Sequence, residues 1–206
     1  MPTGLKKKAD LIMSREQRMA RTIALKAIRP KPFSVWEVMI PVIFIMGFMK
    51  AKADREVFSQ NMLFTKKRAL EAAYAMMRED QTRAAALVSI DSETRKLLTS
   101  IPDGVYSEAI RQEQLKEMEF LIEHYLKLLQ ADGKDYDAMV LCAYAQRKDY
   151  RQFLQALSAL EKQVSGAATR TLGAQTDAAM LSRIELATDE LRRAEVDRIF
   201  GPGQQG

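Results

Sequence analysis

The apolar run at residues 33–51 constrains this chain more than any other feature of its 206 residues. From Val38 to Met49 the run contains no charged side chain and no polar helix face, whereas a soluble core helix normally keeps a polar face. Its 19 residues would extend about 28 Å as a helix, just short of the roughly 30 Å hydrocarbon layer of a bilayer. The run therefore predicts a short membrane-inserted helix.

Several residues of this segment have the character of a membrane anchor. Trp36 and Lys50 lie where interfacial aromatic and snorkelling basic side chains are found, and Pro41 predicts a kink about two turns into the helix. Glu37 follows Ser34 by three residues, which is the spacing of a helix capping box. The alternative role for Glu37 is an acid that handles protons or ions inside the membrane. The predicted membrane-anchor residues are Trp36, Pro41, Ile43, Phe44, Phe48 and Lys50.

A basic arm precedes the apolar run. Residues 1–34 hold nine Lys or Arg and two acids, whereas the whole chain has a net charge of +5, so the remainder is close to neutral. Within residues 14–29 a basic arc faces an apolar arc, with Ser14 and Gln17 placed to begin a helix and Pro30 placed to end it. Such a helix either lies on anionic lipid or packs on the protein's own core. The predicted membrane-surface residues are Arg15, Arg18, Arg21, Lys26 and Arg29.

Lysine and arginine residues flank the apolar run almost equally. Six lie in residues 13–34 and six in residues 50–69, and Lys6, Lys7 and Lys8 favour an N-terminus on the cytoplasmic side of a cytoplasmic membrane. Two architectures stay open. One is a single span with the C-terminal part outside, and the other is a kinked re-entrant anchor with both flanks inside.

Residues 50–78 contain no helix breaker, so one long helix is expected from Val35 to about Glu79. Its apolar residues recur at spacings of four and three, which is the heptad pattern of a coiled-coil seam. This seam needs a partner, either another helix of the same chain or the same helix of a second copy. The predicted helix-pairing residues are Phe58, Met62, Ala69, Ala72 and Met76.

The rest of the chain shows no alternation typical of strands and predicts helices over about 82–100, 105–131, 136–164 and 177–200. The third helix has a possible break at Asp149, and a Gly- and Ala-rich connector covers residues 165–176. Because these helices are amphipathic, they are expected to pack as an antiparallel bundle. The predicted fold is all-α, with a basic amphipathic arm (1–32), a membrane anchor (33–51), a long helix continuing from it (52–79), a helical bundle (80–200) and a frayed tail (201–206).

Residue types that carry catalysis are scarce. The chain has one histidine, His124, and one cysteine, Cys142, which excludes an intramolecular disulfide and a histidine-rich zinc or di-iron site within one chain. His124 is expected to be partly buried beside a solvated face that carries Glu119 and Glu123, and Cys142 to be a buried structural thiol. The sequence therefore predicts no enzyme, no cofactor and no metal site, and it gives no sign of a small-molecule substrate.

Three functions from different classes remain. The favoured one is a non-enzymatic, membrane-anchored helical adaptor or assembly subunit that binds anionic lipid through its arm and protein partners, or itself, through helix faces. The alternatives are a nucleic-acid-binding protein acting through the basic arm, and a transport or energy-coupling subunit that uses Glu37. Nucleic acid is the less favoured partner, because the arm has no aromatic side chain before Phe33 to stack on bases.

Overall fold

The structure is a computed structural model, and it describes residues 2–28, 53–100, 106–173 and 177–202. These residues form seven α-helices and no β-strand, which confirms the predicted all-α fold class. The helices are α1 (Pro2–Ala27), α2 (Ala53–Arg78), α3 (Arg83–Ser100), α4 (Glu108–Gln130), α5 (Tyr136–Tyr144), α6 (Arg147–Leu172) and α7 (Ala178–Phe200).

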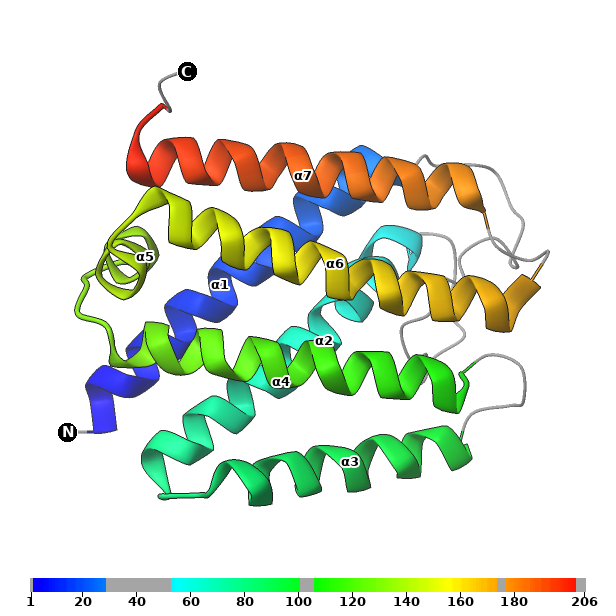
Figure 1. The fold of residues 1–206 in the computed structure, drawn as a ribbon, viewed down its shortest axis with the longest axis horizontal. Helices are drawn as coiled ribbons and strands as arrows, with labels where there is room; N and C mark the ends of the chain where they lie inside the picture. Colours follow the sequence, from blue (N-terminus) through cyan, green and yellow to red (C-terminus); the bar gives the residue numbers. More distant parts are fainter. Residues whose placement is uncertain (1, 29–52, 101–105, 174–176, 203–206) are drawn as a thin grey trace.

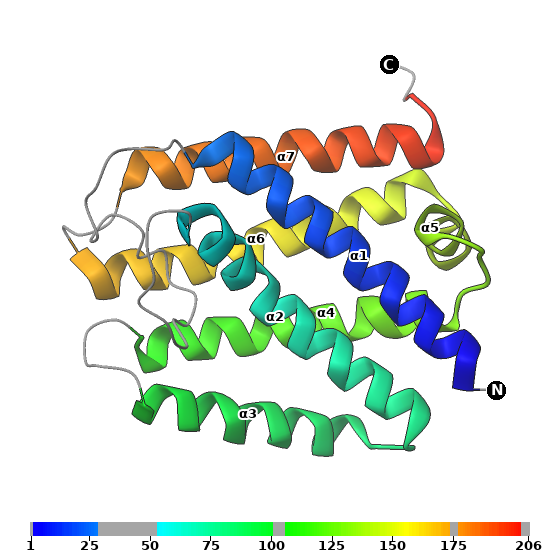
Figure 2. The same cartoon turned by 180° about the vertical axis from the view of Figure 1, so that it is seen from behind.

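The helices pack in two layers (Figure 1). In the first layer α3, α4, α6 and α7 lie side by side with alternating directions, which is the antiparallel helical bundle expected from the sequence. In the second layer α1 and α2 cross the back of the first obliquely, as Figure 2 shows from behind. The short α5 lies across one end, beside the N-terminal part of α1.

The first helix begins well before its expected start at Ser14. Leu5, Ala9 and Ile12 continue the apolar stripe of α1 toward the N-terminus at spacings of four and three, and all three pack on the main core. Burial of this stripe makes the helical conformation favourable over the whole segment. Ser14 is therefore an exposed residue inside α1 and not its N-cap.

The apolar face of α1 is buried in the protein's own core. Met19 and Ile23 lie in one cluster with Phe58 of α2 and with Met180 and Ala187 of α7. Of the two environments that the sequence left open for this face, lipid or the protein core, the structure has the protein core.

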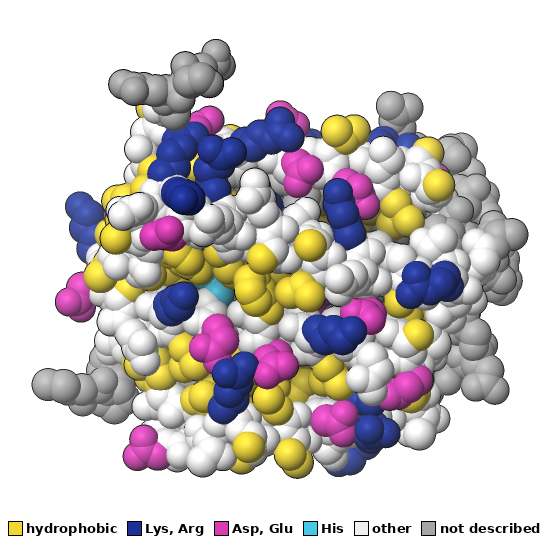
Figure 3. All heavy atoms as spheres, in the orientation of Figure 1, with side chains coloured by type: hydrophobic (Ala, Val, Ile, Leu, Met, Phe, Trp, Pro, Cys, Tyr) yellow, Lys and Arg dark blue, Asp and Glu magenta, His cyan; other side chains and the backbone are white. Residues whose placement is uncertain are grey.

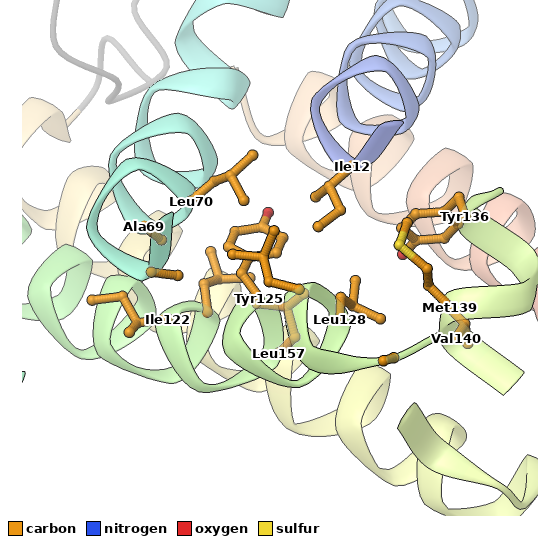
Figure 4. Packing of buried hydrophobic residues seen from close by; sticks show 14 of the residues in the cluster. Ile12, Ala69, Leu70, Ile122, Tyr125, Leu128, Tyr136, Met139, Val140 and Leu157 are labelled. Atoms are coloured by element: carbon orange, nitrogen blue, oxygen red, sulfur yellow. The ribbon is translucent and has the colours of Figure 1, made fainter. Parts of the chain in front are cut away.

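The main core surrounds α4. Figure 4 shows Tyr125 of α4 at its centre, with Ile12 of α1, Leu70 of α2 and Leu157 of α6 packed around it. Each of these four side chains is buried. Burial from several sides makes α4 the central helix of the fold.

The helix expected over residues 136–164 is divided into α5 and α6, a few residues before the possible break at Asp149. The division falls at Ala145, whose φ of 51° lies in the left-handed region that ends helices. Beyond residue 164, α6 continues through the expected connector to Leu172. It does so because Val164 and Ala167 are buried against Tyr106 and Ile110.

No helix within residues 2–28, 53–100, 106–173 or 177–202 is long and apolar enough to cross a membrane. The predicted anchor at residues 33–51, including Glu37, lies outside the described residues. The membrane-inserted part of the fold therefore stays a prediction. The same holds for the anchor residues Trp36, Pro41, Ile43, Phe44, Phe48 and Lys50.

Gly133, in the turn between α4 and α5, has no room for a side chain. A Cβ at this position would lie 2.6 Å from the backbone nitrogen of Met139 and 2.9 Å from the carbonyl carbon of Ala138. We expect Gly133→Ala to lower the free energy of unfolding by about 1–3 kcal/mol, because the start of α5 must move. Urea denaturation at constant pH measures this change.

Gly166 of α6 provides the control for this substitution. A Cβ there would meet only Nη1 of Arg170, at an ordinary 3.5 Å. Gly166→Ala should therefore raise the free energy of unfolding by about 0.5–1 kcal/mol, as expected in a helix interior. Equal responses from the two variants would contradict the close packing of the Gly133 turn.

Candidate functional site: a buried ionic cluster and its pocket

Charged side chains from five helices meet in the interior of the protein. Six of them are less than 9% exposed, and a seventh, Glu161, is partly buried beside them. A buried charge is unfavourable unless it is paired and hydrogen-bonded, so the contacts of each member determine its effect on stability. We define the ionic cluster as Arg15 and Glu16 of α1, Lys66 of α2, Glu117 of α4, Glu161 of α6, and Arg192 and Glu195 of α7.

Arg15 joins α1 to α7. Its Nε donates to Oε2 of Glu195 at 2.8 Å and its Nη2 donates to Oε1 of the same carboxylate at 2.6 Å. Its Nη1 donates to Oε1 of Glu16 at 2.8 Å, and the hydroxyl of Tyr150 donates to Glu195 Oε1 at 2.5 Å. Arg15 is thus an interior residue, and its predicted place on a membrane surface is wrong, because the carboxylates that pair with it lie inside the bundle.

Lys66 lies between two carboxylates. Its Nζ is 3.5 Å from Oε2 of Glu16 and 3.7 Å from Oε1 of Glu161, which also accepts a 2.8 Å hydrogen bond from Nη2 of Arg192. Burial raises the pKa of Glu16, but the charges of Arg15 and Lys66 outweigh burial and lower it to about 2. Glu16 is therefore ionised, and opposite charges alternate through this part of the cluster.

Glu117 differs from the other acids of the cluster. It is 6% exposed, and its carboxyl group takes part in none of the hydrogen bonds or ion pairs among the described residues. Burial, and then the negative charge of Glu161, raise the pKa of Glu117 to about 8, although Lys66 and Arg192 oppose this shift. At neutral pH the carboxyl group of Glu117 therefore holds a proton.

A pocket with a volume of about 120 Å³ opens onto this carboxyl group. It lies between α2, α4, α6 and α7, with Lys66, Glu117 and Glu161 among its polar lining residues. Phe58 and Ile184 contribute to its apolar wall. A concave site with an apolar wall and a few converging polar groups is the usual form of a small-molecule site.

Replacement of Glu117 tests whether this buried acid lowers the stability of the folded protein. In the unfolded chain its pKa is 4.5, and in the folded protein about 8. Between these values unfolding releases a proton, so the free energy of unfolding falls as the pH rises. We expect Glu117→Gln to raise the free energy of unfolding at pH 7 by about 2–3 kcal/mol, measured by urea denaturation. A stabilisation that does not shrink when the pH is lowered toward 4.5 would contradict the protonated state.

His124 lies in an aromatic cluster about two helical turns along α4 from Glu117. Its Nδ1 shares a 2.6 Å hydrogen bond with the hydroxyl of Tyr144, and its ring stacks on Phe153 with centroids 4.0 Å apart. Burial lowers the pKa of His124 to about 3, and Arg15 is among the cations that favour the neutral ring. Figure 3 shows the histidine as a small cyan area between bands of apolar side chains.

The side chains around His124 only partly follow the expectation. Glu119 and Glu123 are half-exposed and pair with Arg83 at 2.8 and 2.9 Å, whereas His124 itself is only 4% exposed. Cys142 is exposed, so the buried thiol expected from the sequence is wrong. The reason is that α5 turns Met139 toward the core and Cys142 toward solvent.

Three of the other predicted surface residues, Arg18, Arg21 and Lys26, lie on the outer side of α1. Arg18 and Arg21 are exposed, Lys26 forms a 2.8 Å ion pair with Glu190, and Arg29 lies outside the described residues.

The predicted helix-pairing residues of α2 all face other helices of the same chain. Phe58 and Met62 belong to the cluster with α1 and α7, and Ala69, Ala72 and Met76 belong to the main core.

Lys66, Glu117, Glu161 and Arg192 are not among the site residues predicted from the sequence. The sequence of α4 does contain a pattern that could have identified Glu117. Beside the stripe of apolar residues that pack in the main core runs a second stripe, whose members recur at spacings of three and four. All members of this second stripe are buried, and they include polar residues. Two buried stripes mark a central helix, and the polar residues of the second stripe mark the site. The second stripe is Gln114, Glu117, Leu121, His124 and Leu128.

The fold and the cluster define an all-α helical bundle with a buried ionic cluster beside a pocket. The chain matches no protein-family model, no curated protein and no solved structure.

Proposed function

We propose that the protein is a non-enzymatic, membrane-anchored helical adaptor or assembly subunit, held against one face of a membrane by residues 33–51. The observation that carries this proposal is the packing of α1 on α2, the two helices that precede and follow the apolar segment. The described residues before the apolar segment end at Ile28, and those after it begin at Ala53. Nε of Arg55 donates to the carbonyl oxygen of Ile28 at 3.2 Å, so the two flanks of the segment lie together.

This packing supports the re-entrant form of the anchor. A single span would put α1 and α2 on opposite sides of the bilayer, which is incompatible with their contact. Residues 29–52 number 24 and would extend about 36 Å as a helix. In a re-entrant anchor this length is divided between a part that enters the membrane and a part that returns to the same face. The segment would therefore reach roughly halfway through the hydrocarbon layer. Both basic flanks then lie on the same side, and the positive-inside rule makes this the cytoplasmic side.

The outer face of α1 supports contact with anionic lipid. Arg18, Arg21 and Leu25 follow one another at spacings of three and four, so they share one face, and all three are exposed, Leu25 by 60%. Basic side chains around an apolar one suit the interface of a membrane with acidic headgroups. The adaptor role rests on the surface of the bundle, where apolar side chains gather on the face seen in Figure 3 and where Val88, Leu141 and Leu186 are exposed.

The experiment that tests this function combines membrane retention with the position of both termini. We expect a chain tagged at both ends to stay in the membrane pellet after a carbonate wash. In spheroplasts both tags should resist external protease, and in inverted vesicles both should be digested. A variant with residues 33–51 replaced by a Gly-Ser linker keeps α1 and α2 and should lose membrane retention. Tags on opposite sides would refute the re-entrant anchor, and loss of the unmodified chain from the pellet would refute the membrane role.

A further inference from the structure

The pocket contains an acid that has no partner within the described chain. Glu16 and Glu195 each pair with Arg15, and Glu161 pairs with Lys66 and Arg192. Glu117 lines the same pocket without a hydrogen bond or ion pair, although it is 6% exposed. An unpaired acid of this kind lowers stability, and proteins retain such groups chiefly where they function.

We propose that this pocket binds a small organic cation, a primary alkylammonium ion, with the carboxylate of Glu117 as its counter-ion. The pocket volume of about 120 Å³ sets the size of the ligand. Since a cavity of about 150 Å³ accommodates benzene, a ligand of about four to six non-hydrogen atoms fits this pocket.

The charge of the lining favours a cation. Four acids line the pocket, and the two lysines that line it both lie near carboxylates. Nζ of Lys66 is 3.7 Å from Oε1 of Glu161, and Nζ of Lys162 is 3.6 Å from Oε2 of Glu185. The lining thus has an excess of acid, and an anionic ligand would meet carboxylates that are not fully neutralised. The four acids are Glu117, Glu161, Glu185 and Asp189.

The apolar part of the lining favours an organic cation over a bare inorganic one. A hydrated metal ion needs oxygen ligands around it, whereas one wall of this pocket is hydrocarbon. An alkyl chain placed against that wall is removed from water, which contributes about 0.8 kcal/mol for each buried CH₂ group. The apolar lining residues are Phe58, Met62, Val164, Leu181 and Ile184.

Binding exchanges a proton for the cation. The charged groups that face Glu117 are Lys66, Glu161, Arg192 and Glu16. Burial and the negative charges of Glu161 and Glu16 raise the pKa of its carboxyl group above neutral pH, against the opposing charges of Lys66 and Arg192. When the ammonium ion enters, the carboxyl O–H bond breaks, the proton passes to solvent, and the carboxylate pairs with the ammonium group. An alkylammonium ion, with a pKa of about 10, stays charged throughout. Affinity therefore rises with pH until Glu117 is ionised.

Isothermal titration calorimetry of the 206-residue chain with n-butylammonium chloride tests the proposal. We expect one saturable site with a Kd on the order of 1 mM or below. The Kd should fall roughly tenfold per pH unit between about pH 6 and 8, with release of about one proton per ligand at the lower pH. n-Butanol, the neutral isostere, should bind at least about tenfold more weakly.

Variants distinguish loss of the ligand site from loss of the fold. Glu117→Gln is expected to be more stable than the unmodified chain and to lose at least about tenfold in affinity for n-butylammonium. Ile184→Trp, which fills the apolar side and leaves Glu117 in place, should weaken binding as well. The matched control is Glu113→Gln, one turn away on α4, whose carboxylate pairs with Lys116 at 2.9 Å outside the pocket lining. This control should bind normally.

Three results would overturn the proposal: full affinity in Glu117→Gln, equal affinity for n-butanol and n-butylammonium, or no saturable binding up to about 100 mM ligand. The site is independent of the membrane anchor. A chain that fails the carbonate-wash experiment can still bind the amine, and a chain that passes it can fail to bind.

Discussion

Arg15→Met is expected to lower the free energy of unfolding by about 3–5 kcal/mol, which corresponds to a fall in Tm of roughly 10 °C for a chain of this size. The substitution keeps a long side chain but removes the guanidinium that pairs with Glu16 at 2.8 Å and with both oxygens of Glu195. Both carboxylates then stay buried with fewer partners, and that loss exceeds the value of a surface ion pair. Chemical and thermal denaturation at pH 7 measure the change.

Arg18→Met is the matched control on the same helix. Arg18 is exposed, and its replacement should alter the free energy of unfolding by no more than about 0.5 kcal/mol. Equal stability of Arg15→Met and Arg18→Met would mean that α1 is not docked in the bundle. In that case the arm would be a free amphipathic helix, and the ionic cluster would lose Arg15 and Glu16.

The difference between Arg15 and Arg18 marks the limit of a sequence pattern. On a helical wheel the two arginines share one basic arc, and both were predicted to face lipid. In the structure their environments differ. Arg15 pairs with Glu195, which lies 180 residues further along the chain, whereas Arg18 is exposed. A local periodicity identifies an amphipathic helix, but it contains no information on which distant carboxylate faces each cation.

Helix positions were more accessible to sequence reasoning than helix environments. The C-terminal end of α2 and both ends of α3 and α4 fall within a few residues of the expected ones, because Gly, Pro and Asp side chains act locally. The length of α1 and the extension of α6 were missed, because both depend on burial against other helices. For the same reason Glu117 was not recognised, since its burial requires α2, α6 and α7 to be in place.

The packing of α1 on α2 also bears on a question that charge counting left balanced. Equal numbers of basic residues on both sides of the apolar segment gave no preference between a span and a re-entrant anchor. For the proposed anchor, a tertiary contact between the flanks favours the re-entrant form, because two helices in contact must share one side of a bilayer. This contact also makes the two-tag experiment decisive, since the two architectures predict opposite locations for the C-terminal tag.

Acidification is expected to destabilise the unmodified protein far more than the variant His124→Phe. Burial lowers the pKa of His124 from 6.5 to about 3, Glu16 opposes this shift, and the charges of Arg15, Lys127 and Lys66 add to it. Between these two pH values the unfolded chain binds a proton that the folded protein does not bind. The free energy of unfolding therefore falls as the pH falls, by about 3–5 kcal/mol over the whole interval.

The variant loses this proton linkage and one hydrogen bond. Near pH 7.5 His124→Phe should be less stable by about 1 kcal/mol, because the 2.6 Å bond to Tyr144 is absent while the stacking on Phe153 is kept. Below about pH 5 it should be the more stable protein. Glu16, whose pKa is about 2, adds acid sensitivity to both proteins and cancels in the comparison. Urea denaturation from about pH 4 to 7.5 should give two stability curves that cross, and parallel curves would mean that His124 is protonated in the folded protein.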